Sequence, residues 1–219
     1  SLFRAEVLGE LSEDVYLIKH NHDPDRSVQV AVSHLALRDR QADRGPVILL
    51  HGSFSNRGFW LSDKGEGLAR HLLEQGFDVW VMEQRGHGLS PRNQDYLRNP
   101  LERYVLHDMP AVNAFVQEKT SAKPAWVGHS LGGVIIASAV AAGQLTAVNC
   151  SGMALLGAQA LRRPWYLWLP LVGPVLRLLV WRKGELDGRD LGIGPENEPA
   201  GLINEQLCGH GWFGRCSSG

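Results

Sequence analysis

Short apolar runs alternate with longer helix-like stretches through the middle of the chain. The four runs are Val47–Leu50, Phe77–Met82, Ala125–Val127 and Gly152–Leu156. Short apolar runs of this kind, followed by glycine-rich turns, are typical of buried strands. The helix-like stretches lie around residues 67–74, 105–119 and 134–142. With right-handed crossovers, this alternation predicts an α/β fold with a mostly parallel, doubly wound sheet.

The first forty residues have a different pattern, which predicts an antiparallel start to the sheet. We expect strands at Arg4–Leu11 and Val15–Lys19, joined by the polar turn Ser12–Asp14, and a further strand at Val28–Leu37. Polar residues between two apolar runs favour such a turn. These strands would form the leading edge of the sheet.

The apolar pattern changes after Gly157. Residues 164–181 are strongly apolar, but they contain three prolines, one glycine and Arg177, which argue against a single membrane-spanning helix. A polar stretch rich in glycine and proline follows, up to Pro199. We therefore expect a core at residues 1–158 and a lid or cap at residues 159–219. The lid tryptophans would either cover an apolar ligand, rest on a lipid surface, or pack on a core of their own.

Composition and charge narrow the class of protein. The chain has 219 residues, of which 44% are hydrophobic, so it can bury one substantial core. Its formal net charge is −1, with no run of either sign, so nothing in the charge pattern suggests binding to nucleic acid or a polybasic membrane patch. The three cysteines predict neither a disulfide framework nor a zinc site. No secretory leader opens the chain, so we expect a cytoplasmic protein.

The segment Gly128-His129-Ser130-Leu131-Gly132 carries the clearest chemistry. It has the spacing G-x-S-x-G between a predicted strand and a predicted helix, the context of a serine nucleophile. A sharp turn there would hold Ser130 in a strained conformation with positive φ and present its hydroxyl at the tip. The helix start supplies backbone N–H groups that suit an oxyanion, with Leu131 as the first donor.

A second strand ends in His51-Gly52-Ser53-Phe54. Because Gly52 lets the backbone pass close to the serine, the Ser53 N–H can serve as the second oxyanion donor. We interpret His51 as a residue that orders this loop by hydrogen bonds rather than as a base.

A third strand breaks into Arg85-Gly86-His87-Gly88-Leu89-Ser90. Together the three junctions, in the order His-Gly, Arg-Gly-His-Gly-x-Ser and Gly-His-Ser-x-Gly-Gly, resemble the α/β-hydrolase family, and within it the lipases and esterases. The resemblance covers about residues 47–157. Arg85 and His87 are interpreted as structural residues of the turn, and Asp108 as a residue of the helix before the nucleophile strand. Leu131 stands where the acid lipases have glutamine.

The resemblance implies a serine hydrolase for carboxylic esters with hydrophobic acyl groups, working through an acyl-enzyme on Ser130. The expected substrate-binding residues are His51, Gly52, Phe54, His129, Trp165 and Trp168. Thioester cleavage, acyl transfer, or a binding protein without catalysis remain alternatives. No cofactor is implied. The nine histidines show no metal-binding spacing, so we expect no metal.

The catalytic acid and base are the open question. In this fold the order along the chain is serine, acid, histidine, and no convincing pair follows Ser130. Asp187 and Asp190 lie in the predicted lid, and His210 precedes no strand, although it is the candidate base. We therefore expect the chain to be a fragment that ends inside or just after its lid, with an exposed apolar sheet edge and poor folding on its own.

Overall fold

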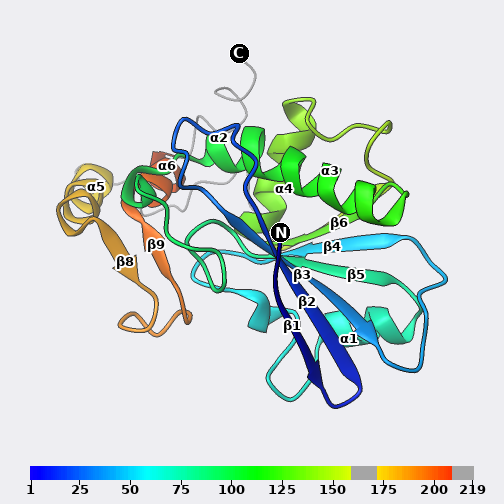
Figure 1. Ribbon diagram of the computed structural model, residues 1–219. Coiled ribbons are helices and arrows are strands. Elements are labelled where there is room, and N and C mark those ends of the chain that lie inside the picture. Colours follow the sequence, from blue (N-terminus) through cyan, green and yellow to red (C-terminus); the bar gives the residue numbers. More distant parts are fainter. Residues whose placement is uncertain (159–171, 209–219) are drawn as a thin grey trace.

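The computed structural model describes residues 1–158 and 172–208, and in them a mixed sheet forms the centre of the molecule (Figure 1). The sheet strands are β1 (Leu2–Leu8), β2 (Leu11–Ile18), β3 (Val30–Leu37), β4 (Pro46–Leu50), β5 (Asp78–Met82), β6 (Ala125–His129) and β7 (Gly152–Leu156). Their order across the sheet is β1-β2-β3-β5-β4-β6-β7. The strands from β5 to β7 pair in parallel, and those from β1 to β3 are antiparallel, as the sequence pattern predicts.

Helices cover both faces of the sheet (Figure 1). They are η1 (Arg57–Phe59), α1 (Leu68–Glu74), η2 (Tyr96–Arg98), α2 (Leu101–Arg103), η3 (Tyr104–Asp108), α3 (Met109–Thr120) and α4 (Leu131–Ala141). Apolar residues of α3 and α4 pack on one face, and those of α1 pack on the other. β4 is buried along its whole length because it lies between β5 and β6 with helices on both sides.

The N-terminal hairpin turns at a different place from the one the sequence predicts. β1 and β2 join at Gly9 and Glu10, with Leu8 opposite Leu11, and Gly9 has a φ of +64°. A two-residue turn needs this left-handed backbone, which glycine adopts without strain. Residues 12–14 therefore lie inside β2 and do not form the turn. Glu13 is buried in that strand, where Arg4 and Arg57 pair with its carboxylate.

The segment predicted as a lid contains regular structure in its described part. This cap segment, residues 172–208, comprises α5 (Val172–Lys183), β8 (Glu185–Asp187), β9 (Asn197–Pro199) and α6 (Ala200–Cys208). β8 and β9 form a separate antiparallel pair, and α5 and α6 lie with them on one side of the molecule (Figure 1). No helix of the described residues is long and apolar enough to cross a membrane.

The cap segment is attached to the core by specific contacts. The Tyr96 hydroxyl donates to the Asn197 carbonyl oxygen at 3.0 Å, and the Leu101 N–H donates to the Glu205 carboxylate at 2.7 Å. Gly201 lies so close to Arg98 that a Cβ would be 2.8 Å from its carbonyl carbon. These contacts hold α6 and β9 against the turns that follow β5.

Candidate active site

The site lies at the edge of the sheet where β4 and β6 end. The two strands are parallel neighbours, with Leu50 opposite Gly128. Because the carboxyl ends of parallel strands meet at one edge, the loop after β4 and the turn after β6 begin side by side. This brings residues 51–56 and Ser130 together.

Ser130 occupies the turn between β6 and α4 in a left-handed conformation, with φ +50° and ψ −115°. Its N–H donates to the Leu156 carbonyl oxygen at 2.8 Å, and its own carbonyl accepts the Val134 N–H at 3.1 Å. A non-glycine residue with this backbone is strained, and such strain is a feature of nucleophile turns. The side chain makes no capping bond to α4, so the hydroxyl is not used to stabilise the helix.

Three glycines allow this turn to pack. A Cβ on Gly128 would lie 2.6 Å from the Gly133 nitrogen, and one on Gly132 would lie 2.4 Å from the Leu50 carbonyl oxygen. A Cβ on Gly52 would lie 3.0 Å from the Ser130 Cβ. The loop after β4 therefore touches the serine directly, and no side chain fits between them.

The two residues expected to supply oxyanion donors lie in the two segments that meet at the serine, and their role stays a prediction. Leu131 is the first residue of α4, and the N–H groups of a first helical turn have no partner within the helix. Ser53 follows Gly52, which contacts the serine. The partial positive charge at the start of α4 adds to the favourable electrostatics for an anion here.

His51 orders this loop and is fully buried. Its Nδ1 lies 2.9 Å from the Gly52 carbonyl oxygen, and its Nε2 accepts the Gln84 N–H at 3.2 Å. These two bonds fit the neutral tautomer with the proton on Nδ1. Burial, with the nearby His87, lowers the pKa of His51 to about 3. The enclosed ring is bonded within the loop and to the turn after β5, so its side chain orders the loop, and a contact of His51 with substrate stays a prediction.

A cavity of about 480 Å³ opens beside this loop. Its walls come from three parts of the chain, and include Ser53, Phe54, Asn56, Phe59, His129, Ile193 and Pro195. Phe59 stacks on the His129 ring with the centroids 4.3 Å apart. The His129 Nδ1 is buried and has no hydrogen-bond partner among the described residues. Two of the expected binding residues, Phe54 and His129, thus line one cavity.

Buried charged side chains stabilise the turn after β5. This agrees with the interpretation of Arg85 and His87 as structural residues. Arg85 binds Asp23 at 2.7 Å and Asp108 at 2.5 Å, and all three side chains are enclosed. Burial alone would lower the pKa of His87, but the Glu198 carboxylate at 3.2 Å raises it above its ordinary value. This turn supports the loops of the site and does not supply a base.

The structure does not assign the catalytic base. Within residues 1–158 and 172–208, no histidine is hydrogen-bonded to the Ser130 hydroxyl, and no group of His, Cys, Asp and Glu residues could hold a metal ion. His210, Trp165 and Trp168 lie outside the described residues. Their expected roles stay predictions.

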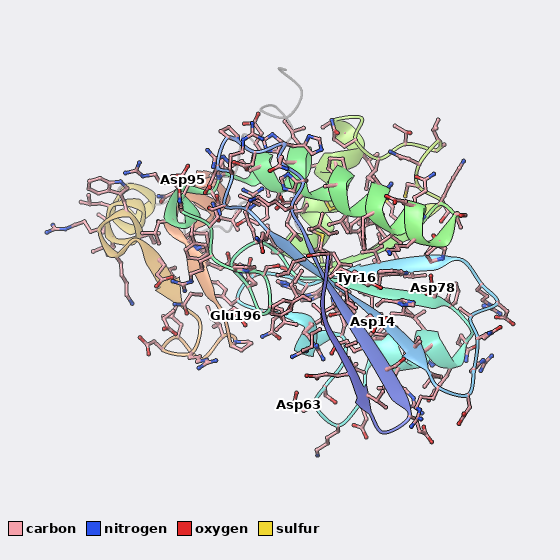
Figure 2. The ribbon with its side chains drawn as sticks, in the orientation of Figure 1. Asp14, Tyr16, Asp63, Asp78, Asp95 and Glu196 are labelled. Carbon is pink, nitrogen blue, oxygen red and sulfur yellow. The ribbon has the colours of Figure 1, made fainter. Side chains whose placement is uncertain are left out.

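Sequence reasoning missed the contribution of the β8–β9 hairpin. Glu198 is fully buried and accepts the Phe54 N–H at 2.9 Å, and Glu196 accepts from the Asn56 side chain at 2.6 Å. In Figure 2, Glu196 lies on the side of the hairpin that faces the sheet. About 140 residues separate each pair along the chain, so no local pattern signals these contacts.

Comparison with known proteins identifies the family of the fold. The family model described as alpha/beta hydrolase fold matches residues 45–191. The tear acid lipase-like protein of Mesocricetus auratus is 27% identical over 151 residues, which are 65% of this chain and 36% of that protein. Triacylglycerol lipase 2 of Arabidopsis thaliana is 34% identical over 143 residues, covering 61% of this chain and 32% of that protein. The chain spans about a third of the length of these relatives.

A solved structure shows the same fold at low sequence identity. The monoacylglycerol lipase of Paleococcus ferrophilus superposes with a TM-score of 0.53 and 17% identity. The match covers 86% of this chain and 71% of that protein. The β4 and β6 junctions, the glycine contacts and the left-handed serine therefore occur in a fold shared with a solved lipase.

Proposed function

Since this chain belongs to the alpha/beta hydrolase fold family, we propose that it hydrolyses carboxylic esters with Ser130 as the nucleophile. The observation that carries the proposal is the backbone of Ser130, left-handed at a strand-to-helix turn with Gly52 packed against its Cβ. The relatives named as lipases support the same reaction class.

The proposed reaction has two stages. The Ser130 Oγ attacks the ester carbonyl while a base takes its proton, and the base returns that proton to the departing alcohol. The N–H groups of Ser53 and Leu131 stabilise the negative charge on the carbonyl oxygen. Water then attacks the acyl-enzyme, loses a proton to the same base, and releases the acid with Ser130 restored.

We propose that the base lies outside the residues that the structure describes. Fully buried His51 and His87 use their ring nitrogens in hydrogen bonds, so neither is available. His210 remains our candidate from the sequence. A serine without a base is a weak nucleophile, so this residue determines how much activity the chain has.

We propose a hydrophobic acyl group as the preferred substrate. The supporting feature is the cavity beside the loop after β4, whose aromatic walls are Phe54, Phe59 and the His129 ring. Its volume of about 480 Å³ lies within the range of small-molecule sites.

We also propose that the cap segment touches lipid surfaces transiently. Val175, Leu178, Leu179 and Trp181 of α5 are all more than half exposed. Their spacing places Val175, Leu178 and Leu179 on one face of the helix, and α5 ends in Arg182 and Lys183. An apolar face flanked by cations suits the boundary of a lipid layer.

Labelling with a fluorophosphonate probe tests the proposal. The folded wild-type chain is expected to form an adduct at Ser130, located by mass spectrometry, and the Ser130→Ala variant to form none. An adduct would also place the base within the 219 residues. No adduct in a folded sample would instead favour a binding protein of this fold, or a base supplied from elsewhere. Product analysis with an added alcohol separates hydrolysis from acyl transfer.

A further inference from the structure

In the loop after β4, Ser53 lies between two peptide groups, and a buried side chain is hydrogen-bonded to each of them. The first, between Gly52 and Ser53, has its carbonyl oxygen bonded by the His51 Nδ1 at 2.9 Å. The second, between Ser53 and Phe54, has its N–H bonded to the Glu198 Oε1 at 2.9 Å. His51 belongs to the loop itself, whereas Glu198 comes from β9 of the cap segment.

Glu198 is enclosed and has few other partners. Its side chain has no exposed surface, and the same Oε1 lies 3.2 Å from the His87 Nε2. Its Oε2 is buried without a hydrogen-bond partner among the described residues. A buried carboxylate is costly unless it is paired, so Glu198 is held in place by its bonds to His87 and to the Phe54 N–H.

The backbone at Phe54 requires this support. Phe54 has a φ of +58°, which is strained for a residue with a side chain. Its carbonyl oxygen accepts the Glu196 N–H at 3.2 Å, and Gly194 passes so close that a Cβ there would lie 2.0 Å from that oxygen. Residues 194–198 therefore hold Phe54 at both its N–H and its carbonyl.

We propose that Glu198 is a positioning residue that fixes the Ser53 and Phe54 peptide groups, so that docking of the β8–β9 hairpin completes the oxyanion site beside Ser130. The effect of Glu198 on catalysis rests on the proposed function, whereas its bond to the Phe54 N–H does not. Oxyanion donors act only when they are held at the position where charge develops. A loop with a strained residue and no such anchor would relax and misplace the Ser53 N–H.

Two nearly isosteric variants separate the hydrogen bond from the packing. Glu198→Gln keeps an oxygen for the Phe54 N–H and the His87 Nε2, whereas Glu198→Met keeps the length of the side chain and removes the oxygen. Glu198→Asp keeps the charge beside His87 but withdraws the carboxylate by one methylene, and it serves if the Met variant does not fold. Glu185→Gln is the matched control, because Glu185 lies in the same hairpin and its partly exposed carboxylate forms an ion pair with Arg92, 2.9 Å away.

The first measurement is hydrogen exchange of the Phe54 amide by NMR, in variants that unfold cooperatively. We expect exchange to accelerate about tenfold or more in the Met and Asp variants and to stay within about threefold of wild type in the Gln variant and the control. The second is steady-state hydrolysis of p-nitrophenyl butyrate. In the Met and Asp variants, kcat should fall about tenfold or more while KM changes less than about twofold. The Gln variant should keep most of the wild-type kcat.

Three outcomes would overturn the inference: wild-type exchange at Phe54 in a folded Met or Asp variant, equal losses in Gln and Met, or an equal loss in the Glu185 control. If the wild-type chain shows no turnover that depends on Ser130, the proposed function fails. The exchange experiment then still decides whether Glu198 fixes the loop.

Discussion

Gly132 shows how one missing side chain sets the geometry of the nucleophile turn. A Cβ at this position would lie 2.4 Å from the Leu50 carbonyl oxygen and 2.5 Å from that of His51. Both contacts are with backbone, which cannot move without shifting the end of β4. The helix α4 can therefore approach β4 only because residue 132 is glycine.

We expect Gly132→Ala to lower the free energy of unfolding by about 2 kcal/mol or more, because the methyl group overpacks a rigid site. Gly152→Ala is the control, since a Cβ there would meet no atom within 4 Å. Urea denaturation followed by circular dichroism measures both. Equal stability of the two variants would contradict the close approach of α4 to β4.

His51 gives stability a pH dependence of known sign. Its pKa in the folded chain is lowered from 6.5 to about 3, chiefly by burial. As the pH falls from about 6.5 to about 3, His51 is protonated in the unfolded chain but not in the folded chain. The free energy of unfolding therefore decreases over this range. Between pH 7 and pH 4.5, wild type should lose roughly 2 kcal/mol more than His51→Asn. Parallel urea titrations at the two pH values check this, and identical losses would show that His51 is not buried as a neutral ring.

At the scale of elements, Arg85 joins three segments that are far apart in the sequence. It binds Asp23 before β3 and Asp108 at the start of α3, and its own position follows β5. His20 adds a bond to Asp108 at 2.9 Å. Arg103 also lies 3.3 Å from Asp23, so Arg85 is the fully buried cation that the two carboxylates share.

Arg85→Met should destabilise the chain by about 3–5 kcal/mol, because it removes the buried cation that two buried carboxylates share. Arg70→Met is the comparison: its bonds to Glu10 and Glu74 lie at the surface, and their loss should cost far less than the loss of Arg85. Urea denaturation at neutral pH gives both values. A cost for Arg85→Met as small as that for Arg70→Met would argue against a buried ion network.

The exposed face of α5 leads to a prediction for lipid binding. Leu178→Glu should weaken co-sedimentation with vesicles of phosphatidylcholine and phosphatidylglycerol about tenfold, since it places a charge on the apolar face. Leu2→Glu changes a residue of equal exposure, 56% against 54%, at the opposite end of the chain, and should leave binding unchanged. Equal effects of the two changes would mean that α5 has no special role.

The elements that sequence predicts best here are those with a local physical cause. Ser130 and β6 are recognisable because glycine spacing and an apolar run occur within ten residues, and the apolar run Gly152–Leu156 is observed as β7. The sequence predicts the hairpin turn at the wrong residues because a charged residue such as Glu13 is typical of a loop. In the fold, Arg4 and Arg57 pair with its carboxylate and allow it to be buried in a strand. The role of Glu198 depends on Phe54, and no periodicity links residues so far apart.

At the scale of the whole molecule, β7 is an open edge. It is the last strand of the described sheet, and all five of its residues are exposed. Met153, Leu155 and Leu156 each expose at least 40% of their surface. An apolar strand with one side unpaired is a template for association with another chain.

We therefore expect the purified chain to associate, with an average mass that rises with concentration in light scattering. Leu155→Lys should shift it toward monomer, because a charge on an edge strand opposes pairing. Val148→Lys is the control, since Val148 is more exposed, at 78%, but precedes the strand. A monodisperse wild-type monomer that melts cooperatively would contradict this prediction.

The order of strands also has a consequence for how the chain folds during synthesis. β4 lies between β5 and β6, both of which follow it in the chain. During synthesis, both edges of β4 stay unpaired until β5 (Asp78–Met82) is made. The second edge is covered only when β6 (Ala125–His129) follows. The antiparallel strands β1 to β3 can form first, since their partners are already made. Between the synthesis of β4 and that of β6, the nascent chain therefore carries an apolar strand with an uncovered edge, which favours aggregation.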